Sequence, residues 1–297
     1  MIGARLLELA RRAVEIGWAS LLVKRHIRRG PRHGLDRELI VSLTSYPPRF
    51  STLHLTLRSL LNQSVSPDRL IVWIAHGDAI QLPQAVCGLE AIGVEIRLCD
   101  DLRSFKKIVP ALEQFPDAYV VTADDDLYYR RNWLEGLVKA AMPTTNDIVA
   151  HTVRRPTYVD GAFATIWNWD MNAVDAATQL PSDDIYPCTG AGALYPPRSL
   201  HPDAVDRDQF ERLCPTCDDS WLAWMARRNG TLVRRSGTRR WTRLIAWQGT
   251  NAGSLSASNF ATSRAVLQQD EINRRLADHF GPLNSLLPDR ADGWDRS

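Results

Sequence analysis

The sequence predicts an α/β protein whose central sheet is mostly parallel and covered by helices on both faces. Short apolar runs alternate with helical patterns between residues 39 and 123. The runs are rich in Val, Ile and Leu along their whole length, as expected of strands that are buried on both faces. Each run ends in a cluster of polar residues, and ligands of open α/β sheets bind at the carboxyl ends of the strands. The same pattern therefore predicts both a fold and the edge of the sheet that holds a site.

The first half of the chain contains the four most regular strands and the helices between them. Strands are expected at residues 39–43, 70–75, 94–98 and 118–123. Helices are expected at residues 51–63, 84–92 and 104–115. Pro110 lacks a backbone N–H and crowds the preceding turn, so the third helix should kink or end early. This alternation of strand and helix indicates a parallel sheet.

The second half of the chain is less regular and richer in aromatic and small residues. Helices are expected at residues 133–141, 218–228 and 267–280, and a strand at 147–152. Residues 156–186 are expected to form a strand pair with long loops. Residues 189–195 are expected to form one strand, in which Gly190 and Gly192 permit close approach by a ligand or by backbone.

Three regions are expected along the chain. Residues 1–37 comprise a basic amphipathic helix and a turn-rich linker. Residues 38–250 hold the α/β pattern and form the main domain. Residues 251–297 form a C-terminal helical extension.

The N-terminal helix combines apolar residues at helical spacing with a strong excess of basic residues. Residues 1–34 contain eight Lys and Arg residues against two Glu residues, a net charge of +6, whereas the whole chain carries +2. A basic amphipathic helix binds the surface of an anionic bilayer, which predicts a peripheral membrane contact through residues 1–29. The alternative is a helix packed on the domain with its charged side exposed. No apolar run reaches the length that spans a bilayer.

Composition argues against several other classes of protein. A net charge of +2 does not suggest nucleic-acid binding, and the arginine-rich segment 234–243 has one interleaved aromatic residue and no RNA-binding motif. Five scattered cysteines argue against a disulfide framework and for a reducing compartment. Cys214 and Cys217 have C-x-x-C spacing, but no second pair completes a zinc site.

Three consecutive aspartates, Asp124, Asp125 and Asp126, follow the fourth predicted strand directly. Side chains alternate along an extended segment, so Asp124 and Asp126 are expected on one side and Asp125 on the other. Two carboxylates aimed at one point suit Mg²⁺ or Mn²⁺, which bind oxygen ligands. The alternative is a solvated acidic turn. His76, or a residue within 247–254, is a candidate for a third ligand.

These features resemble the GT-A type of glycosyltransferase, which has a Rossmann-like sheet, uses a nucleotide-sugar donor and carries a DxD metal motif. More narrowly, the chain is similar to bacterial surface-polysaccharide transferases and, more distantly, to exostosin-like enzymes. The matching segments lie in the right order within residues 39–230, at 41–49, 106–112, 122–126, 133–134, 189–197 and 213–221.

The resemblance implies transfer of a sugar from a nucleoside diphosphate sugar with the help of Mn²⁺ or Mg²⁺. It makes Asp126, the last of the triplet, the direct metal ligand. Asp124 would face the ribose or reach the metal through water, and Asp125 would contact the sugar. The cation would neutralise charge that grows on the leaving diphosphate.

The resemblance also places the nucleotide beside the end of the first strand. Tyr46 could stack on the base, and Arg49 could pair with a phosphate through two hydrogen bonds. The alternative is a rigid surface turn that carries a solvated arginine. Lys107, near the start of the helix after the third strand, is expected to contact the diphosphate or the sugar, because helix amides also attract anions. A solvent-facing lysine is the alternative there.

Asp218 and Asp219 begin the helix predicted at 218–228, where acidic residues are common caps. The resemblance makes this pair the acceptor-side carboxylates. If the enzyme inverts, Asp219 or Asp218 is the general base, and we favour Asp219. If the enzyme retains, as the exostosin-like relatives imply, the carboxylate stabilises the oxocarbenium-like transition state or holds the sugar.

The predicted function is a metal-dependent glycosyltransferase, hexosyl or N-acetylhexosaminyl in type, that acts on a glycan or lipid-linked acceptor in cell-surface polysaccharide biosynthesis. It would work in the cytoplasm, peripheral at the inner face of the plasma membrane. Two alternatives stay open. One is a nucleotidyltransferase with a similar sheet and metal, although segment 46–49 lacks the glycines of its phosphate loop. The other is a non-catalytic sugar- or lipid-binding protein on the same scaffold.

Overall fold

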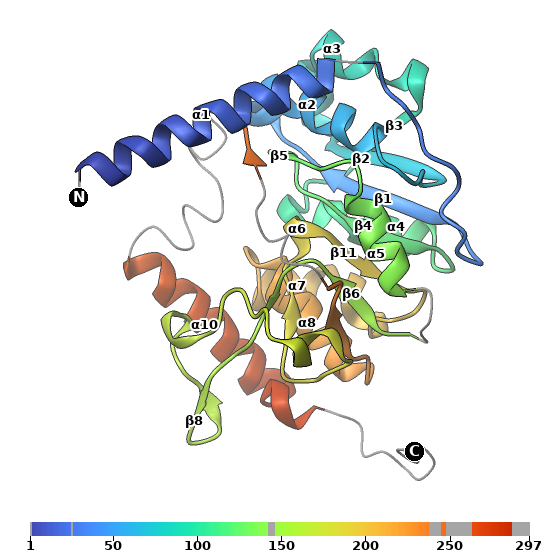
Figure 1. The fold of residues 1–297 in the computed structure, drawn as a ribbon. Helices are drawn as coiled ribbons and strands as arrows, with labels where there is room; N and C mark the ends of the chain where they lie inside the picture. Colours follow the sequence, from blue (N-terminus) through green and yellow to red (C-terminus); the bar gives the residue numbers. More distant parts are fainter. Residues whose placement is uncertain (1, 25, 142–145, 238–244, 248–262, 287–297) are drawn as a thin grey trace.

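The structure, a computed structural model, describes residues 2–24, 26–141, 146–237, 245–247 and 263–286. A seven-stranded sheet lies at its centre (Figure 1). The strands are β1 (Leu39–Thr44), β2 (Arg69–Ala75), β3 (Val94–Cys99), β4 (Tyr119–Thr122), β6 (Ile148–Ala150), β11 (Ala193–Tyr195) and β12 (Val233–Arg235). Their order across the sheet is β12–β6–β11–β4–β1–β2–β3.

The central sheet is mostly parallel. Strand β11 runs antiparallel to both of its neighbours, β4 and β6, and the other pairings in this sheet are parallel. Strand β1 lies between β2 and β4, with Val41 opposite Leu70 and Val121. The predicted fold class, an α/β protein with a mostly parallel sheet flanked by helices, is confirmed. The carboxyl ends of β1 to β4 consequently reach one edge of the sheet.

Helices cover both faces of this sheet (Figure 1). One apolar layer contains α2 (Phe50–Leu61), α3 (Gln84–Cys87) and α5 (Trp133–Ala141). The opposite layer contains α4 (Val109–Gln114), α7 (Arg207–Leu213), α8 (Asp218–Arg228) and α10 (Ser263–Phe280). Successive side chains of β2 pack alternately into the two layers. Val72 and Ile74 belong to the first layer, and Ile71 and Trp73 belong to the second.

Shorter elements complete the fold. Strand pairs form between β5 (Leu127–Tyr128) and β13 (Ile245–Ala246), β7 (Val153–Arg154) and β10 (Tyr186–Pro187), and β8 (Tyr158–Val159) and β9 (Ala162–Phe163). A single helical turn, α6 (Thr189–Gly192), precedes β11. The 3₁₀ helices are η1 (Pro47–Arg49), η2 (His76–Gln81), η3 (Glu90–Ile92), η4 (Arg103–Lys107), η5 (Ile166–Asn168), η6 (Ala176–Gln179), η7 (Pro202–Val205) and η9 (Leu283–Ser285).

Most predicted elements are present, with small shifts at their ends, and α5 and α8 begin and end at the predicted residues. The helices expected at 84–92 and 104–115 are each divided into two pieces. The second becomes η4 and α4, which are separated at Ile108. Pro110 lies in the first turn of α4, where a missing N–H costs no hydrogen bond.

Two predictions about elements were wrong. Residues 189–195 do not form one strand, because α6 occupies the first four of them. The chain turns into β11 at Gly192, whose φ of 114° is readily adopted only by glycine. Helix α7 was missed, although Asp206 caps it by accepting a hydrogen bond from the N–H of Gln209.

The N-terminal helix α1 (Ile2–Lys24) packs on the domain through its second half. Ala19 and Val23 are buried there against Tyr128 and Ile245. The first half extends past the body of the molecule (Figure 1). None of the described helices is both long enough and apolar enough to cross a membrane.

A buried histidine connects α5 to the segment that follows β12. His151 follows β6, and its Nε2 lies 2.9 Å from the carbonyl oxygen of Trp133 while its Nδ1 lies 2.5 Å from Oγ of Ser236. Burial lowers the pKa of His151 to about 3, outweighing the hydrogen bond to the Trp133 carbonyl, which favours the charged form. The imidazole is therefore neutral in the folded protein at neutral pH.

This histidine should make the protein less stable in mild acid. Below its ordinary pKa of about 6.5 the unfolded chain binds a proton that the folded chain does not, so the free energy of unfolding falls as pH falls. The expected loss between pH 6.5 and pH 5 is about 2 kcal/mol. Urea unfolding at pH 7 and pH 5 should show a shallower pH dependence for His151→Gln than for the native protein. Substitution of the exposed His76 by Gln is the control, and equal slopes for all three proteins would contradict the assignment.

Candidate functional site

A cleft of about 570 Å³ opens at the carboxyl edge of the sheet. All four predicted strand ends contribute to its lining, through residues 44–49, Asp78, Asp101 and residues 124–126. The start of α8, the turn α6 and Gln269 of α10 close the other side. The convergence of the four polar clusters, which the sequence predicted, is confirmed.

The cleft is rich in charged side chains and acidic overall. Its described lining contains seven aspartates against five Lys and Arg residues, a formal net charge of −2. The complete chain carries +2, so negative charge is concentrated here. Like charges gathered at a partly buried site repel one another strongly, and they need cations close by.

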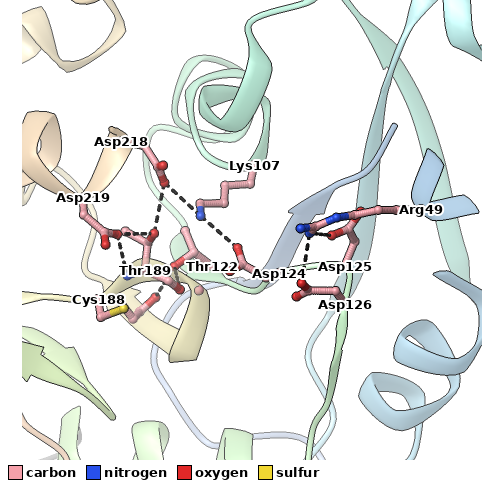
Figure 2. A network of polar contacts seen from close by, with 12 residues as sticks. Arg49, Lys107, Thr122, Asp124, Asp125, Asp126, Cys188, Thr189, Asp218 and Asp219 are labelled. Atoms are coloured by element: carbon pink, nitrogen blue, oxygen red, sulfur yellow. Dashed lines mark hydrogen bonds and ion pairs between the residues drawn. The ribbon is translucent and has the colours of Figure 1, made fainter. Parts of the chain in front are cut away.

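Arg49 neutralises two aspartates of the triplet (Figure 2). Its Nη1 lies 2.6 Å from Oδ1 of Asp125 and 3.1 Å from Oδ2 of Asp126. The hydroxyl of Ser45 donates a hydrogen bond to the other oxygen of Asp125, at 2.5 Å. The guanidinium also lies 5.6 Å from the ring centroid of Tyr46. The Arg49 side chain is 12% exposed, so it is a largely enclosed cation and not a solvated surface side chain.

The orientation predicted for the triplet was wrong. Asp125 and Asp126 reach the same guanidinium, whereas Asp124 points towards Lys107 (Figure 2). The reason is local: β4 ends at Thr122 and a turn follows it before β5, so the alternation of an extended strand does not apply.

Asp126 is a carboxylate whose pKa is raised towards neutral pH. Burial raises its pKa to about 7, and the charges of Asp124 and Asp125 add to the rise while Arg49 opposes it. Burial also raises the pKa of Asp125 despite its contact with Arg49. The turn thus holds more negative charge than its own cation balances.

Lys107 connects the triplet to the acidic pair that begins α8. Its side chain is 7% exposed, and its Nζ lies 2.9 Å from Oδ1 of Asp124 and 2.9 Å from Oδ2 of Asp218. Burial alone would lower the pKa of Lys107, but these two carboxylates hold it well above its usual range. The lysine is the last residue of η4 and lies two residues before α4 begins at Val109.

The acidic pair is held by two residues that the sequence analysis did not identify. Oδ1 of Asp219 lies 2.9 Å from the backbone N and 2.6 Å from the hydroxyl of Thr189, and its Oδ2 lies 3.0 Å from Nη2 of Arg154. Burial would raise the pKa of Asp219, but Arg154 and Lys107 lower it. For Asp218 burial dominates and raises the pKa, although Lys107 opposes it.

Gly190 makes the position of Asp124 possible. A Cβ atom at Gly190 would lie 1.8 Å from Oδ2 of Asp124. The Tyr129 hydroxyl accepts a hydrogen bond from the Asp124 N–H, at 2.7 Å, and donates one to the Gly190 carbonyl, at 2.8 Å. The close approach predicted at Gly190 is therefore made by a carboxylate of the chain itself.

The donor set suits a cation that arrives with a phosphate ligand. Among the described residues, no group of three or more His, Cys, Asp or Glu side chains is arranged to hold a metal ion. However, Mg²⁺ is commonly bound by one or two carboxylates together with substrate phosphates and water. Asp124 and Asp126 supply two carboxylates beside a cleft with excess negative charge, so the residues fit such an ion.

The structure brings together all eight residues that the sequence analysis selected for this site, namely Tyr46, Arg49, Lys107, Asp124, Asp125, Asp126, Asp218 and Asp219. His76, a candidate third ligand, is exposed in η2 and does not line the cleft. Residues 248–254, the other candidate region, and residues 238–243 of the arginine-rich segment lie outside the described residues. Arg154 and Thr189 were missed because their partners are distant in the sequence.

No known protein family and no curated protein matches the sequence. Solved structures with a related arrangement include a mannosyltransferase from Pyrobaculum calidifontis in complex with GDP-mannose and Mn²⁺. It is 13% identical, with a TM-score of 0.44, and the alignment covers 96% of this chain and 84% of that one. Glucosyl-3-phosphoglycerate synthase from Mycobacterium tuberculosis, in complex with Mn²⁺, UDP and phosphoglyceric acid, is 14% identical, with a TM-score of 0.40 and coverage of 80% and 79%.

An inositol-1-phosphate CTP transferase from T. maritima aligns at 12% identity and a TM-score of 0.40, covering 80% of this chain and 96% of that one. Likeness at this level assigns neither an activity nor a ligand to this chain. The chemistry of the cleft is therefore inferred from its own residues.

Replacing Gly190 by Ala should disrupt the cleft without unfolding the sheet. The new Cβ would displace the Asp124 carboxylate, and we expect the affinity for Mn²⁺ to fall at least tenfold, about 1.4 kcal/mol. Isothermal titration calorimetry measures the affinity directly. Gly77→Ala is the matched control, because a Cβ at Gly77 would meet nothing within 4 Å. Native affinity in Gly190→Ala would show that Asp124 is not a ligand.

Proposed function

We propose that this protein is a metal-dependent glycosyltransferase of the GT-A type that moves a sugar from a nucleoside diphosphate sugar to a glycan or lipid-linked acceptor. The observation that carries the proposal is the net charge of −2 in a cleft at the carboxyl edge of the sheet. A nucleoside diphosphate is anionic and would be repelled from such a cleft unless a divalent cation accompanied it. A cation-dependent diphosphate site accounts for this excess of aspartate.

Asp124 and Asp126 would hold Mn²⁺ or Mg²⁺ together with the diphosphate. When bound, the ion would screen the negative charge that develops on the leaving group. Asp126 would be the direct ligand, because burial and the charge of Asp124 raise its pKa despite the contact with Arg49, and a bound divalent cation would stabilise its charged form. Asp125 is buried between Ser45 and Arg49, which supports a role in fixing Arg49 more than a direct sugar contact.

Tyr46 and Arg49 would bind the nucleotide. Arg49 lines the cleft with its side chain 12% exposed, so its guanidinium could donate a hydrogen bond to a phosphate oxygen there. Tyr46 lines the same cleft and presents a ring on which a base could stack. Lys107 would act mainly by holding Asp124 and Asp218 in position, since its Nζ contacts both carboxylates.

The acceptor hydroxyl would be activated by Asp218. Asp219 already accepts two hydrogen bonds from Thr189 and pairs with Arg154, whereas Oδ1 of Asp218 accepts no hydrogen bond from a described residue. In an inverting reaction Asp218 takes the hydroxyl proton as the acceptor oxygen bonds to the anomeric carbon and the carbon–oxygen bond to the diphosphate breaks. In a retaining reaction the same carboxylate would stabilise the positively charged transition state.

The setting we propose is cell-surface polysaccharide biosynthesis at the cytoplasmic face of the plasma membrane. Support comes from α1, where Val14, Trp18 and Leu21 are 72%, 47% and 66% exposed on a helix within a segment of net charge +6. Apolar and basic side chains on one surface helix suit an anionic bilayer. The hexosyl or N-acetylhexosaminyl type of the sugar would follow from the donor that binds.

Nucleotide sugars should stabilise the protein against heat only when Mn²⁺ is present. A donor at one hundred times its dissociation constant adds about 2.7 kcal/mol to the free energy of unfolding. In a thermal-shift panel of nucleotide sugars, Asp126→Asn should remove the Mn²⁺-dependent part of the shift. Asp78→Asn, which changes another aspartate of the cleft, is the matched control. Stabilisation by nucleoside triphosphates with pyrophosphate release, and none by nucleotide sugars, would favour the nucleotidyltransferase instead.

Asp218→Asn should separate catalysis from donor binding. If Asp218 is the acceptor-side carboxylate, kcat should fall by about 10²–10⁴-fold while the donor dissociation constant changes little. Equal losses in both quantities would place Asp218 on the donor side. Asp219→Asn is the variant to compare with it. This change should weaken the contacts of residue 219 with Arg154 and Thr189 and leave the Asp218 carboxylate in place. Kinetics with a soluble acceptor, alongside donor titrations, measure both effects.

A further inference from the structure

Three aromatic side chains, which we call the aromatic row, pack beside the turn that carries the aspartates 124–126, which we call the aspartate turn. The aromatic row consists of Trp18, Tyr128 and Trp247. Tyr128 lies two residues after Asp126, in β5. Its ring meets Trp18 of α1 at 6.1 Å between centroids and Trp247 at 6.0 Å, both edge to face. Tyr128 and Trp247 are 7% and 2% exposed, so the row is buried except at Trp18. Such contacts contribute stability beyond the burial of area alone.

This row is tied to the backbone of the turn by hydrogen bonds. The N–H of Trp247 donates to the carbonyl of Asp126, at 2.9 Å, and its indole Nε1 donates to the hydroxyl of Thr56, at 2.8 Å. The Thr56 hydroxyl in turn lies 2.8 Å from the carbonyl oxygen of Asp125 and 3.0 Å from that of Leu127. Trp247 and Thr56 thus hold the backbone of the turn, from which the aspartate side chains project.

Helix α1 packs against the aromatic row. Its Ala19 and Val23 are buried beside Tyr128, Ile245 and Trp247. The guanidinium of Arg58 in α2 donates a hydrogen bond from Nε to the carbonyl of Val23, at 2.6 Å. The helix is therefore seated against the elements that carry the turn.

The same helix presents an apolar ridge to solvent. Val14, Trp18 and Leu21 are spaced by four and three residues, which places them on one side of the helix. Their exposure, given above, is unusual for side chains of this size on a folded helix. The ridge belongs to residues 1–34 with their net charge of +6, and the described basic side chains Arg11 and Arg28 are exposed. Positive charge beside an apolar ridge is complementary to anionic lipid.

We propose that Trp18 is a positioning residue that connects contact with an anionic bilayer to the geometry of the aspartate turn. Trp18 belongs both to the exposed ridge and to the aromatic row, so docking of α1 on lipid holds Tyr128, Trp247 and the turn in place. The inference rests on the proposed function, because it treats the turn as the cation site. Coupling between two sites is reciprocal, so the ligand that orders the turn also strengthens the contact with lipid.

The test uses three variants of the full chain in solution, without lipid. Trp18→Ala should weaken the affinity for Mn²⁺ about fivefold, within the usual range of coupling between sites. Trp18→Phe, which keeps an aromatic edge against Tyr128, should restore most of it. Leu21→Ala, which shortens the same ridge at a residue outside the aromatic row, should bind Mn²⁺ as the native protein does. The electron paramagnetic resonance signal of free Mn²⁺ gives the affinity of each variant. Because Trp18 is half exposed, its variants should fold.

A second arm tests the bilayer in the presence of a chelator. The native protein should sediment with vesicles of phosphatidylcholine and phosphatidylglycerol and not with phosphatidylcholine alone. Leu21→Glu and Trp18→Ala should both stay in the supernatant. Sedimentation with neither vesicle would overturn the bilayer as partner and point to a protein partner for the ridge. Equal sedimentation with both would overturn the requirement for anionic lipid.

The outcomes separate this inference from the function on which it rests. Equal Mn²⁺ affinity in Trp18→Ala and the native protein would overturn the positioning role and leave the proposed function standing. Equal losses in Trp18→Ala and Leu21→Ala would also overturn it, because the effect would then come from the ridge as a whole. Absence of any Mn²⁺ binding by the native protein, with and without a nucleoside diphosphate, would remove the proposed function, and the inference with it.

Discussion

Concentrated negative charge at the end of β4 is the constraint on which the rest of the site depends. Five aspartates, 124 to 126 with 218 and 219, meet three cations there whose side chains are at most 12% exposed. Ion pairs taken out of water are stable only when their remaining hydrogen bonds are satisfied, which explains the contributions of Ser45 and Thr189. Because Lys107 contacts both Asp124 and Asp218, these two carboxylates are not energetically independent.

The strand pattern and the polar ends of the strands were predictable because each depends on local sequence. Buried strands require long apolar runs, and parallel connections bring their carboxyl ends together, so the positions of Arg49 and Asp124 at one edge followed from the order of elements alone. The acidic residues that begin α8 could be placed in the cleft only through the resemblance, because nothing in the segment itself distinguishes a ligand from a helix cap.

Other features depend on contacts between distant segments and could not be predicted. Arg154 lies in a two-residue strand, and its pairing with Asp219 joins residues 65 positions apart in the sequence. The orientation of the triplet depends on where β4 stops, which is decided by its pairing with β11 and not by the aspartates. The missed helix α7 is different, since its Asp206 cap followed by Gln209 is a sequence signal that was present.

The single antiparallel strand has a consequence for how the cleft is built. A parallel strand brings only its carboxyl end to the ligand edge, whereas β11, running the other way, begins there. Its lead-in turn α6 consequently delivers a main-chain group to the cleft, the Thr189 amide that donates to Asp219. Reversing one strand thus gives this edge of the sheet a peptide dipole that side-chain substitution cannot remove.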